Sequence, residues 1–118
     1  TPESLCFEAI MKKFLGGVNG EDNYFLNYSD GAPWFSTDGR NNTGVYYCGD
    51  RAVDHARKMI KMMKNNGLKI MSYFISDGYM SDSDKDTFGR MYGNDASFID
   101  CTNMMNVAKS MNKKFLQK

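Results

Sequence analysis

The segment Leu68–Ile75, LKIMSYFI, decides how this chain can fold. It is short and almost continuously apolar, and it lies between Gly67 and the turn residues Ser76-Asp77-Gly78. An apolar run of this length between turn residues is typical of a strand that is buried on both faces, as strands of parallel sheets are. The segment therefore predicts a parallel sheet.

The segments on either side of this strand alternate between helical and extended patterns. Residues 5–15 form an amphipathic helix whose apolar face is predicted to carry Leu5, Cys6, Ala9, Ile10 and Phe14. Further elements are predicted as a strand at 24–28, a helix between Asp50 and Gly67, a short helix at 86–92, a strand at 96–100 and a helix at 104–115. Residues 31–50 read as a long loop with room for a short hairpin. This order predicts an α/β fold in which helices cover both faces of a parallel sheet.

Composition limits the class of protein. The 118 residues are enough for one domain, and the apolar fraction of 42% and charged fraction of 25% are those of a globular chain. A formal charge of +1 gives no support for nucleic-acid binding, and no apolar run is long enough to span a membrane. No signal-peptide pattern is present, so we expect a cytoplasmic protein.

The cysteines carry no recognisable chemistry. Cys6, Cys48 and Cys101 are odd in number and far apart, without the close pairs that zinc sites use. We expect reduced and mostly buried thiols.

Two predicted strands end on the same tripeptide, Ser29-Asp30-Gly31 and Ser76-Asp77-Gly78. Parallel sheets bind ligands beyond the carboxyl ends of their strands, which makes Asp30 and Asp77 candidate site residues. Asp before Gly is also ordinary turn chemistry, so both interpretations stay open for Asp30. Trp34 and Phe35 follow in the loop, where they would either contact a partner or cover the end of the sheet.

Three features, taken in order, resemble the latter two-thirds of a von Willebrand factor A domain. Thr1 opens a helix, a hydrophobic strand runs into SDGAP at Ser29–Pro33, and the stretches HARKMIKMMKNNGLKIMSYFI and YGNDASFIDCTNMMNVAKSMNKKFL resemble the closing helices and strands. The intracellular branch that includes the cobalt-chelatase subunit and its bacteriophage relatives is most similar. The resemblance implies one partial von Willebrand A-like, Rossmann-like domain over residues 1–118.

The resemblance also implies a metal-ion-dependent adhesion site, with Thr1 and Asp30 as its metal residues and Ser29, Gly31, Trp34, Phe35 and Asp77 at the partner-binding rim. The Asp-x-Ser-x-Ser loop that supplies most ligands in the family does not occur in this sequence. Mg²⁺ or Mn²⁺ would therefore be held weakly, because such cations prefer near-octahedral oxygen ligation.

The resemblance implies a non-catalytic binding module that works with an AAA+ ATPase in a chelatase-like complex. The alternative is a metal-dependent hydrolase in which Asp30 and Asp77 act as an acid–base pair. If the strands before Thr1 are missing, residues 24–28 form an exposed edge, which predicts a homodimer or a strand supplied by another chain.

Other candidates have simpler interpretations. Asp82, Asp84 and Asp86 alternate, but the Gly and Glu of a calcium loop are absent, and we expect Asp86 to cap the helix that follows. His55 has no partner at catalytic spacing and is expected to be structural or exposed to solvent.

Overall fold

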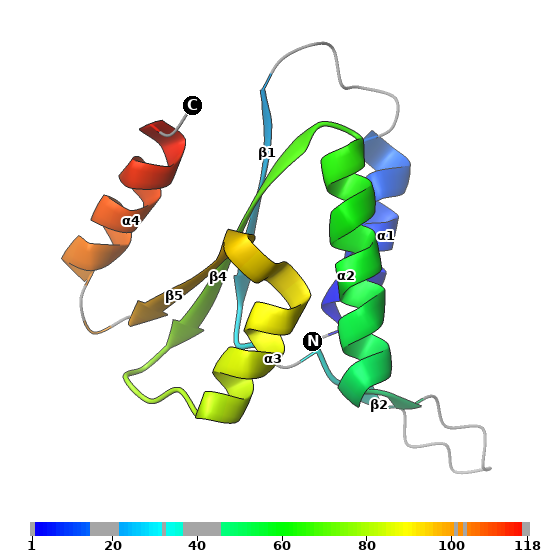
Figure 1. Cartoon of the computed structure of the whole chain (residues 1–118), viewed down its shortest axis with the longest axis horizontal. Helices are drawn as coiled ribbons and strands as arrows, with labels where there is room; N and C mark the ends of the chain where they lie inside the picture. Colours follow the sequence, from blue (N-terminus) through cyan, green and yellow to red (C-terminus); the bar gives the residue numbers. More distant parts are fainter. Residues whose placement is uncertain are drawn as a thin grey trace.

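A three-stranded parallel sheet forms the centre of the computed structural model, which describes residues 2–14, 22–31, 33–36, 46–100, 102 and 104–116 (Figure 1). The strands are β1 (Asn23–Ser29), β4 (Leu68–Ser76) and β5 (Ala96–Asp100), in the order β1-β4-β5. β1 pairs with β4 from Asn23↔Leu68 to Ser29↔Phe74, and β5 pairs with the second half of β4. The apolar segment that begins at Leu68 is thus the central strand, and the predicted α/β fold is confirmed.

Helices cover both faces of the sheet, as predicted (Figure 1). Helices α1 (Glu3–Phe14), α2 (Gly49–Asn65) and α3 (Asp82–Tyr92) lie on one face, and α4 (Met104–Leu116) lies on the other. Side chains of β4 alternate between the two cores, with Ile70 and Phe74 on the α1–α3 side and Met71 and Tyr73 on the α4 side. None of the helices in the described ranges has the length and apolar character needed to cross a bilayer.

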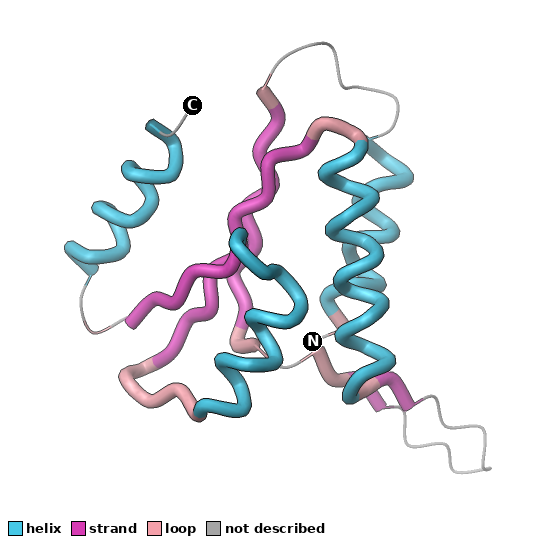
Figure 2. Tube along the Cα trace, viewed as in Figure 1, coloured by secondary structure: helices cyan, strands magenta, loops and turns pink. Residues whose placement is uncertain are grey.

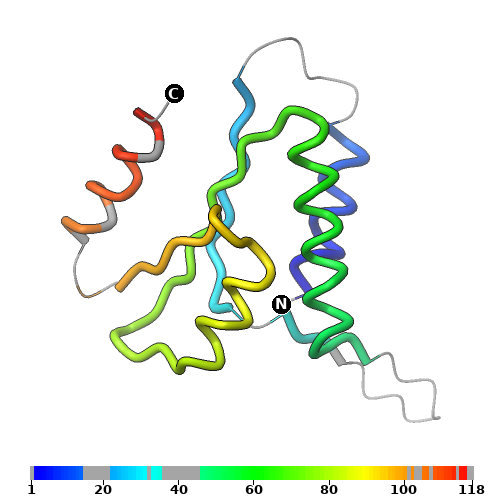
Figure 3. Tube along the Cα trace, viewed as in Figure 1, coloured from blue at the N-terminus to red at the C-terminus, as the bar shows by residue number. Residues whose placement is uncertain are grey.

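The chain path brings distant segments together (Figure 3). β1 and β4 are neighbours although α2 and a long loop separate them in the sequence. Within that loop, β2 (Phe35–Ser36) pairs antiparallel with β3 (Tyr46–Tyr47), close to the start of α2 (Figure 2). The loop therefore holds the short hairpin for which the sequence left room.

Helix α1 does not bury the face that its sequence pattern predicts. Phe7 and Met11 are its buried apolar residues, whereas Leu5 and Phe14 are 42% and 46% exposed. Cys6 and Ala9, also on the predicted face, are exposed as well. The helix packs against α2 and the sheet core through Phe7 and Met11, so its larger apolar face is left towards solvent in the described part of the chain.

Two further expectations are wrong. Cys6 and Cys48 are exposed free thiols and not buried ones, while Cys101 lies outside the described residues.

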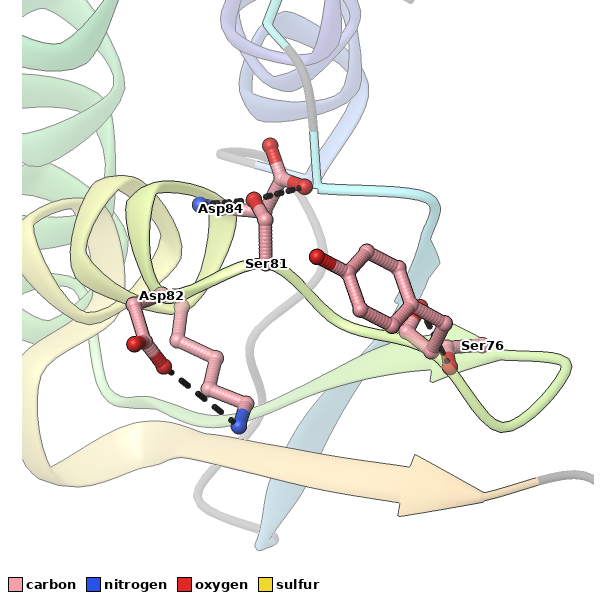
Figure 4. Close-up of polar contacts among 6 residues, drawn as sticks. Ser76, Ser81, Asp82 and Asp84 are labelled. Carbon is pink, nitrogen blue, oxygen red and sulfur yellow. Dashed lines mark hydrogen bonds and ion pairs between the residues drawn. The ribbon is translucent and has the colours of Figure 1, made fainter.

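Helix α3 begins at Asp82, and its N-cap is Ser81 and not Asp86. The Ser81 hydroxyl accepts from the Asp84 N–H at 3.0 Å and donates to the Asp84 carboxylate at 2.5 Å (Figure 4). The Ser81 hydroxyl thus satisfies one of the first backbone donors of the helix, the Asp84 N–H.

Candidate functional site

The two Ser-Asp-Gly tripeptides form matching turns at the carboxyl ends of β1 and β4. In the first, the Ser29 hydroxyl accepts the N–H of Gly31 at 2.9 Å, and in the second the Ser76 hydroxyl accepts the N–H of Gly78 at 3.1 Å. The serine stabilises the turn in each case, and the aspartate between serine and glycine is exposed. Because β1 and β4 are parallel neighbours, Asp30 and Asp77 lie at the same end of the sheet, where the strands have their carboxyl ends, as the sequence predicts.

Glycine is required in the first turn for two reasons. Gly31 has a φ of +88°, which side chains other than glycine rarely adopt. A Cβ atom built on Gly31 would lie 1.8 Å from Cε2 of Phe74, a core residue of β4. The turn backbone therefore rests directly on the Phe74 ring, which fixes the position of Asp30 relative to the core.

A third aspartate ends the remaining strand. Asp100 is the last residue of β5, and its carboxylate accepts from the backbone N–H of Thr102 at 2.9 Å and from the Thr102 hydroxyl at 2.6 Å. These hydrogen bonds lower the pKa of Asp100 below its ordinary value. Sequence reasoning missed this residue because no glycine follows it.

The described residues do not fit a metal site by themselves. No group of three or more His, Cys, Asp or Glu side chains in these parts of the chain could hold a metal ion. Asp30 offers one exposed carboxylate, and Thr1 lies outside the described residues. A cation held here would need ligands from elsewhere.

Behind the first turn lies a buried polar cluster made by Glu3, Asn27, Ser29 and Tyr92, which we call the Glu3 cluster. The Glu3 carboxylate is 5% exposed and accepts hydrogen bonds from the Ser29 and Tyr92 hydroxyls and, at 3.3 Å, from the Asn27 amide. The Asn27 amide also donates to the Tyr92 hydroxyl at 2.9 Å. This cluster ties the first turn of α1 to β1 and to the end of α3.

The protonation of Tyr92 follows from this setting. Burial raises the pKa of the Tyr92 hydroxyl well above its ordinary value, and the adjacent Glu3 carboxylate raises it further. The hydrogen bond that the Asn27 amide donates to the Tyr92 hydroxyl acts in the opposite direction. Tyr92 therefore stays a neutral donor to Glu3.

A second cluster joins Ser4, Tyr47 and His55. Nδ1 of His55 lies 2.7 Å from the Tyr47 hydroxyl and 3.1 Å from the Ser4 hydroxyl, and these two hydroxyls are also hydrogen-bonded to each other. A serine beside a histidine suggests nucleophilic catalysis, but Ser4 is 0% exposed and a substrate cannot reach it. The cluster instead attaches the β2–β3 hairpin to α1 and α2, which agrees with a structural role for His55.

A groove of about 460 Å³ runs between α1 and β1. Its helix side is formed by Glu3, Cys6, Phe7 and Ile10, and its strand side by residues 25–30, which end at Ser29 and Asp30. In the described part of the chain β1 pairs with β4 alone, so this groove follows the unpaired edge of the sheet. We call it the β1 groove.

The residues predicted at the rim do not form one site. Ser29 lines the β1 groove, but it is buried and engaged by Glu3 and Gly31. Gly31 and the 58% exposed Trp34 line a separate cavity of about 230 Å³ between the start of α2 and one side of α3. Phe35 belongs to β2 and is half-buried, and Asp77 lines neither space.

Comparison with known proteins adds no relative to this picture. The chain matches no protein-family model, no curated protein and no solved structure with which it was compared.

Proposed function

We propose that this chain is a non-catalytic protein-binding module of von Willebrand A type, and that it binds by accepting a strand of another chain along β1. The observation that carries the proposal is the β1 groove, where a strand edge with no pairing partner among the described residues lies beside apolar side chains. An unpaired edge presents a row of backbone N–H and C=O groups, which is the template that strand addition uses.

Side chains around this edge suit an added strand. Phe7, Ile10, Phe25 and Leu26 line the groove, so an incoming strand would bury apolar side chains against them while its backbone pairs with β1. β5 is the other edge of the sheet, but it has five residues against the seven of β1. β1 therefore offers the longer ladder.

The exposed face of α1 extends the same surface. Cys6 and Ile10, which belong to the apolar face predicted from sequence, line the β1 groove, and Leu5 and Phe14 on that face are exposed. An amphipathic helix that directs apolar residues to solvent is unusual in a monomer and marks an interaction surface.

The partner in the cell is, on this proposal, a component of a cytoplasmic chelatase-like complex, such as an AAA+ ATPase. In the purified protein, a second copy of the chain is the available partner, and two β1 strands can pair about a two-fold axis. Asp30 stands at the end of the β1 groove, where it would contribute one carboxylate to a Mg²⁺ or Mn²⁺ ion whose other ligands come from Thr1 and the partner.

The hydrolase alternative lacks support from the geometry. Asp30 and Asp77 are both exposed at the carboxyl end of the sheet. The described residues place no accessible nucleophile and base together there.

Light scattering on the purified chain tests the proposal. We expect a dimer at micromolar concentration, and we expect Tyr28→Lys to be monomeric, because a lysine on an edge strand opposes pairing with another strand. Tyr28 is 49% exposed on β1, and Tyr79, which is 82% exposed after β4, provides the matched control Tyr79→Lys. A monomeric wild type, or a dimer that both variants retain, would count against strand addition at β1.

A further inference from the structure

A second groove, on the opposite side of α2 from α1, carries a concentrated positive charge. It has a volume of about 820 Å³ and lies between the second half of α2 and the end of α3 with the turn η1 (Gly93–Asp95). Five cationic and two anionic side chains line it, so its formal charge is +3 although that of the whole chain is +1. The cations are Arg57, Lys58, Lys61, Lys64 and Arg90.

Three of these cations already have carboxylate partners. Lys64 pairs with Asp95 at 2.7 Å and Arg90 with Asp50 at 2.6 Å, and Arg57 lies 3.9 Å from Asp54. Lys58 and Lys61 form no ion pair with any described residue, and both are exposed. The groove therefore contains two ammonium groups whose charge is not compensated within the described part of the chain.

The spacing of the lysines concentrates this charge. Lys58, Lys61 and Lys64 follow one another at intervals of three residues along α2, so they form one ridge on the helix surface. Like charges at this spacing repel, and an anionic ligand placed beside Lys58 and Lys61 would relieve the repulsion.

We propose that this basic groove binds an acidic segment of a partner protein. Gly89 and Gly93 line the groove, and a Cβ built on either would meet nothing within 4 Å, so no neighbouring side chain blocks the groove at these two positions. Asp54 and Asp95 on the same lining would accept N–H donors of a peptide.

Nucleic acid fits the groove less well. Its aromatic lining residue, Tyr92, is 3% exposed and gives bases no surface on which to stack. A formal charge of +1 over the chain is also far from the basic footprint of a nucleic-acid-binding domain.

The basic groove and the β1 groove have no lining residue in common, so the two sites can be tested separately. A loss of acidic-peptide binding would leave strand addition at β1 untouched, and a monomeric Tyr28→Lys variant should still bind the peptide.

Fluorescence anisotropy with a labelled oligoglutamate peptide at low ionic strength tests the proposal. We expect Lys58→Glu with Lys61→Glu to weaken binding by about tenfold, because two favourable surface interactions become repulsive. The matched control is Lys109→Glu with Lys113→Glu, which reverses two exposed lysines on α4 and should change affinity by less than about twofold. All four lysines are exposed, so both variants should keep the wild-type melting temperature.

Three outcomes would overturn the proposal. The first is wild-type protein that does not bind the peptide, and the second is an equal loss of affinity in both double variants. The third is tighter binding of a single-stranded DNA oligonucleotide of equal charge, which would make the groove a nucleic-acid site.

Discussion

Replacing Gly31 by alanine tests whether the turn after β1 rests on the core as the structure indicates. Two costs add at this position. An alanine at a φ of +88° destabilises the folded state by about 1 kcal/mol, since its Cβ meets the backbone in that conformation. The new methyl group would also lie 1.8 Å from Cε2 and 2.7 Å from Cζ of Phe74, so the ring must move.

The Phe74 ring has little room in which to move. It is 3% exposed, and its centroid lies 5.4 Å from that of Phe88 and 6.0 Å from that of Phe98. Forcing an extra group into a packed core costs about 1–3 kcal/mol. Together with the backbone cost, we expect Gly31→Ala to lower the free energy of unfolding by about 2–4 kcal/mol.

Urea denaturation followed by circular dichroism measures this loss, and Gly67→Ala separates its two parts. Gly67 has a nearly equal φ of +85°, but a Cβ there would meet nothing within 4 Å. Gly67→Ala should therefore cost about 1 kcal/mol, with only the backbone contribution. If Gly31→Ala proves no more destabilising than Gly67→Ala, the contact between the turn and Phe74 is refuted.

Three more predictions concern the Glu3 cluster and the strand-end carboxylates. Glu3→Ala removes the acceptor of the buried Ser29 and Tyr92 hydroxyls and should cost about 3 kcal/mol or more in urea denaturation. Glu8→Ala, which removes an exposed carboxylate 3.2 Å from Lys12, should cost less than about 1 kcal/mol. Equal losses would show that Glu3 is not buried in this network. The pKa of Tyr92 is raised in the folded state, so the unfolded chain releases this proton first as the pH rises. The stability that this shift contributes is fully present below about pH 10 and should fall above it by up to about 1.4 kcal/mol per pH unit, a fall that urea denaturation at alkaline pH would detect and that Tyr92→Phe should reduce. At a concentration near its Kd, Mn²⁺ should raise the melting temperature of the wild type by only about 2 °C. Asp30→Ala should lose this rise, and the control Asp77→Ala should keep it. A rise that persists in Asp30→Ala would assign the cation to another site.

The sequence predicts the framework of this fold because the signals for it are local. The apolar run from Leu68 to Ile75, the turn residues around it and the helical periodicity of α2 each depend on neighbours within a few positions. The order of elements then favours a parallel sheet, and a parallel sheet places Asp30 and Asp77 together at the carboxyl ends of its strands.

The same local signals fail where the outcome depends on distant contacts. The apolar pattern of α1 predicts burial of Leu5 and Phe14, but the helix packs against the core through Phe7 and Met11, which are buried instead. The hydrogen bond between Glu3 and Tyr92 joins residues 89 positions apart, so no spacing rule could have identified it. The contacts of His55 with Ser4 and Tyr47 were missed for the same reason.

Amide hydrogen exchange along β1, measured by NMR above and below the concentration at which the chain associates, tests the proposed strand addition most directly. Backbone groups on the unpaired side of an edge strand exchange with solvent, and pairing with a new strand protects them. We expect association to slow exchange at alternate residues of β1 (Asn23–Ser29), while β5 (Ala96–Asp100) is unchanged. Association that leaves β1 exchange unchanged, or that protects β5 instead, would contradict the proposal that β1 is the binding edge.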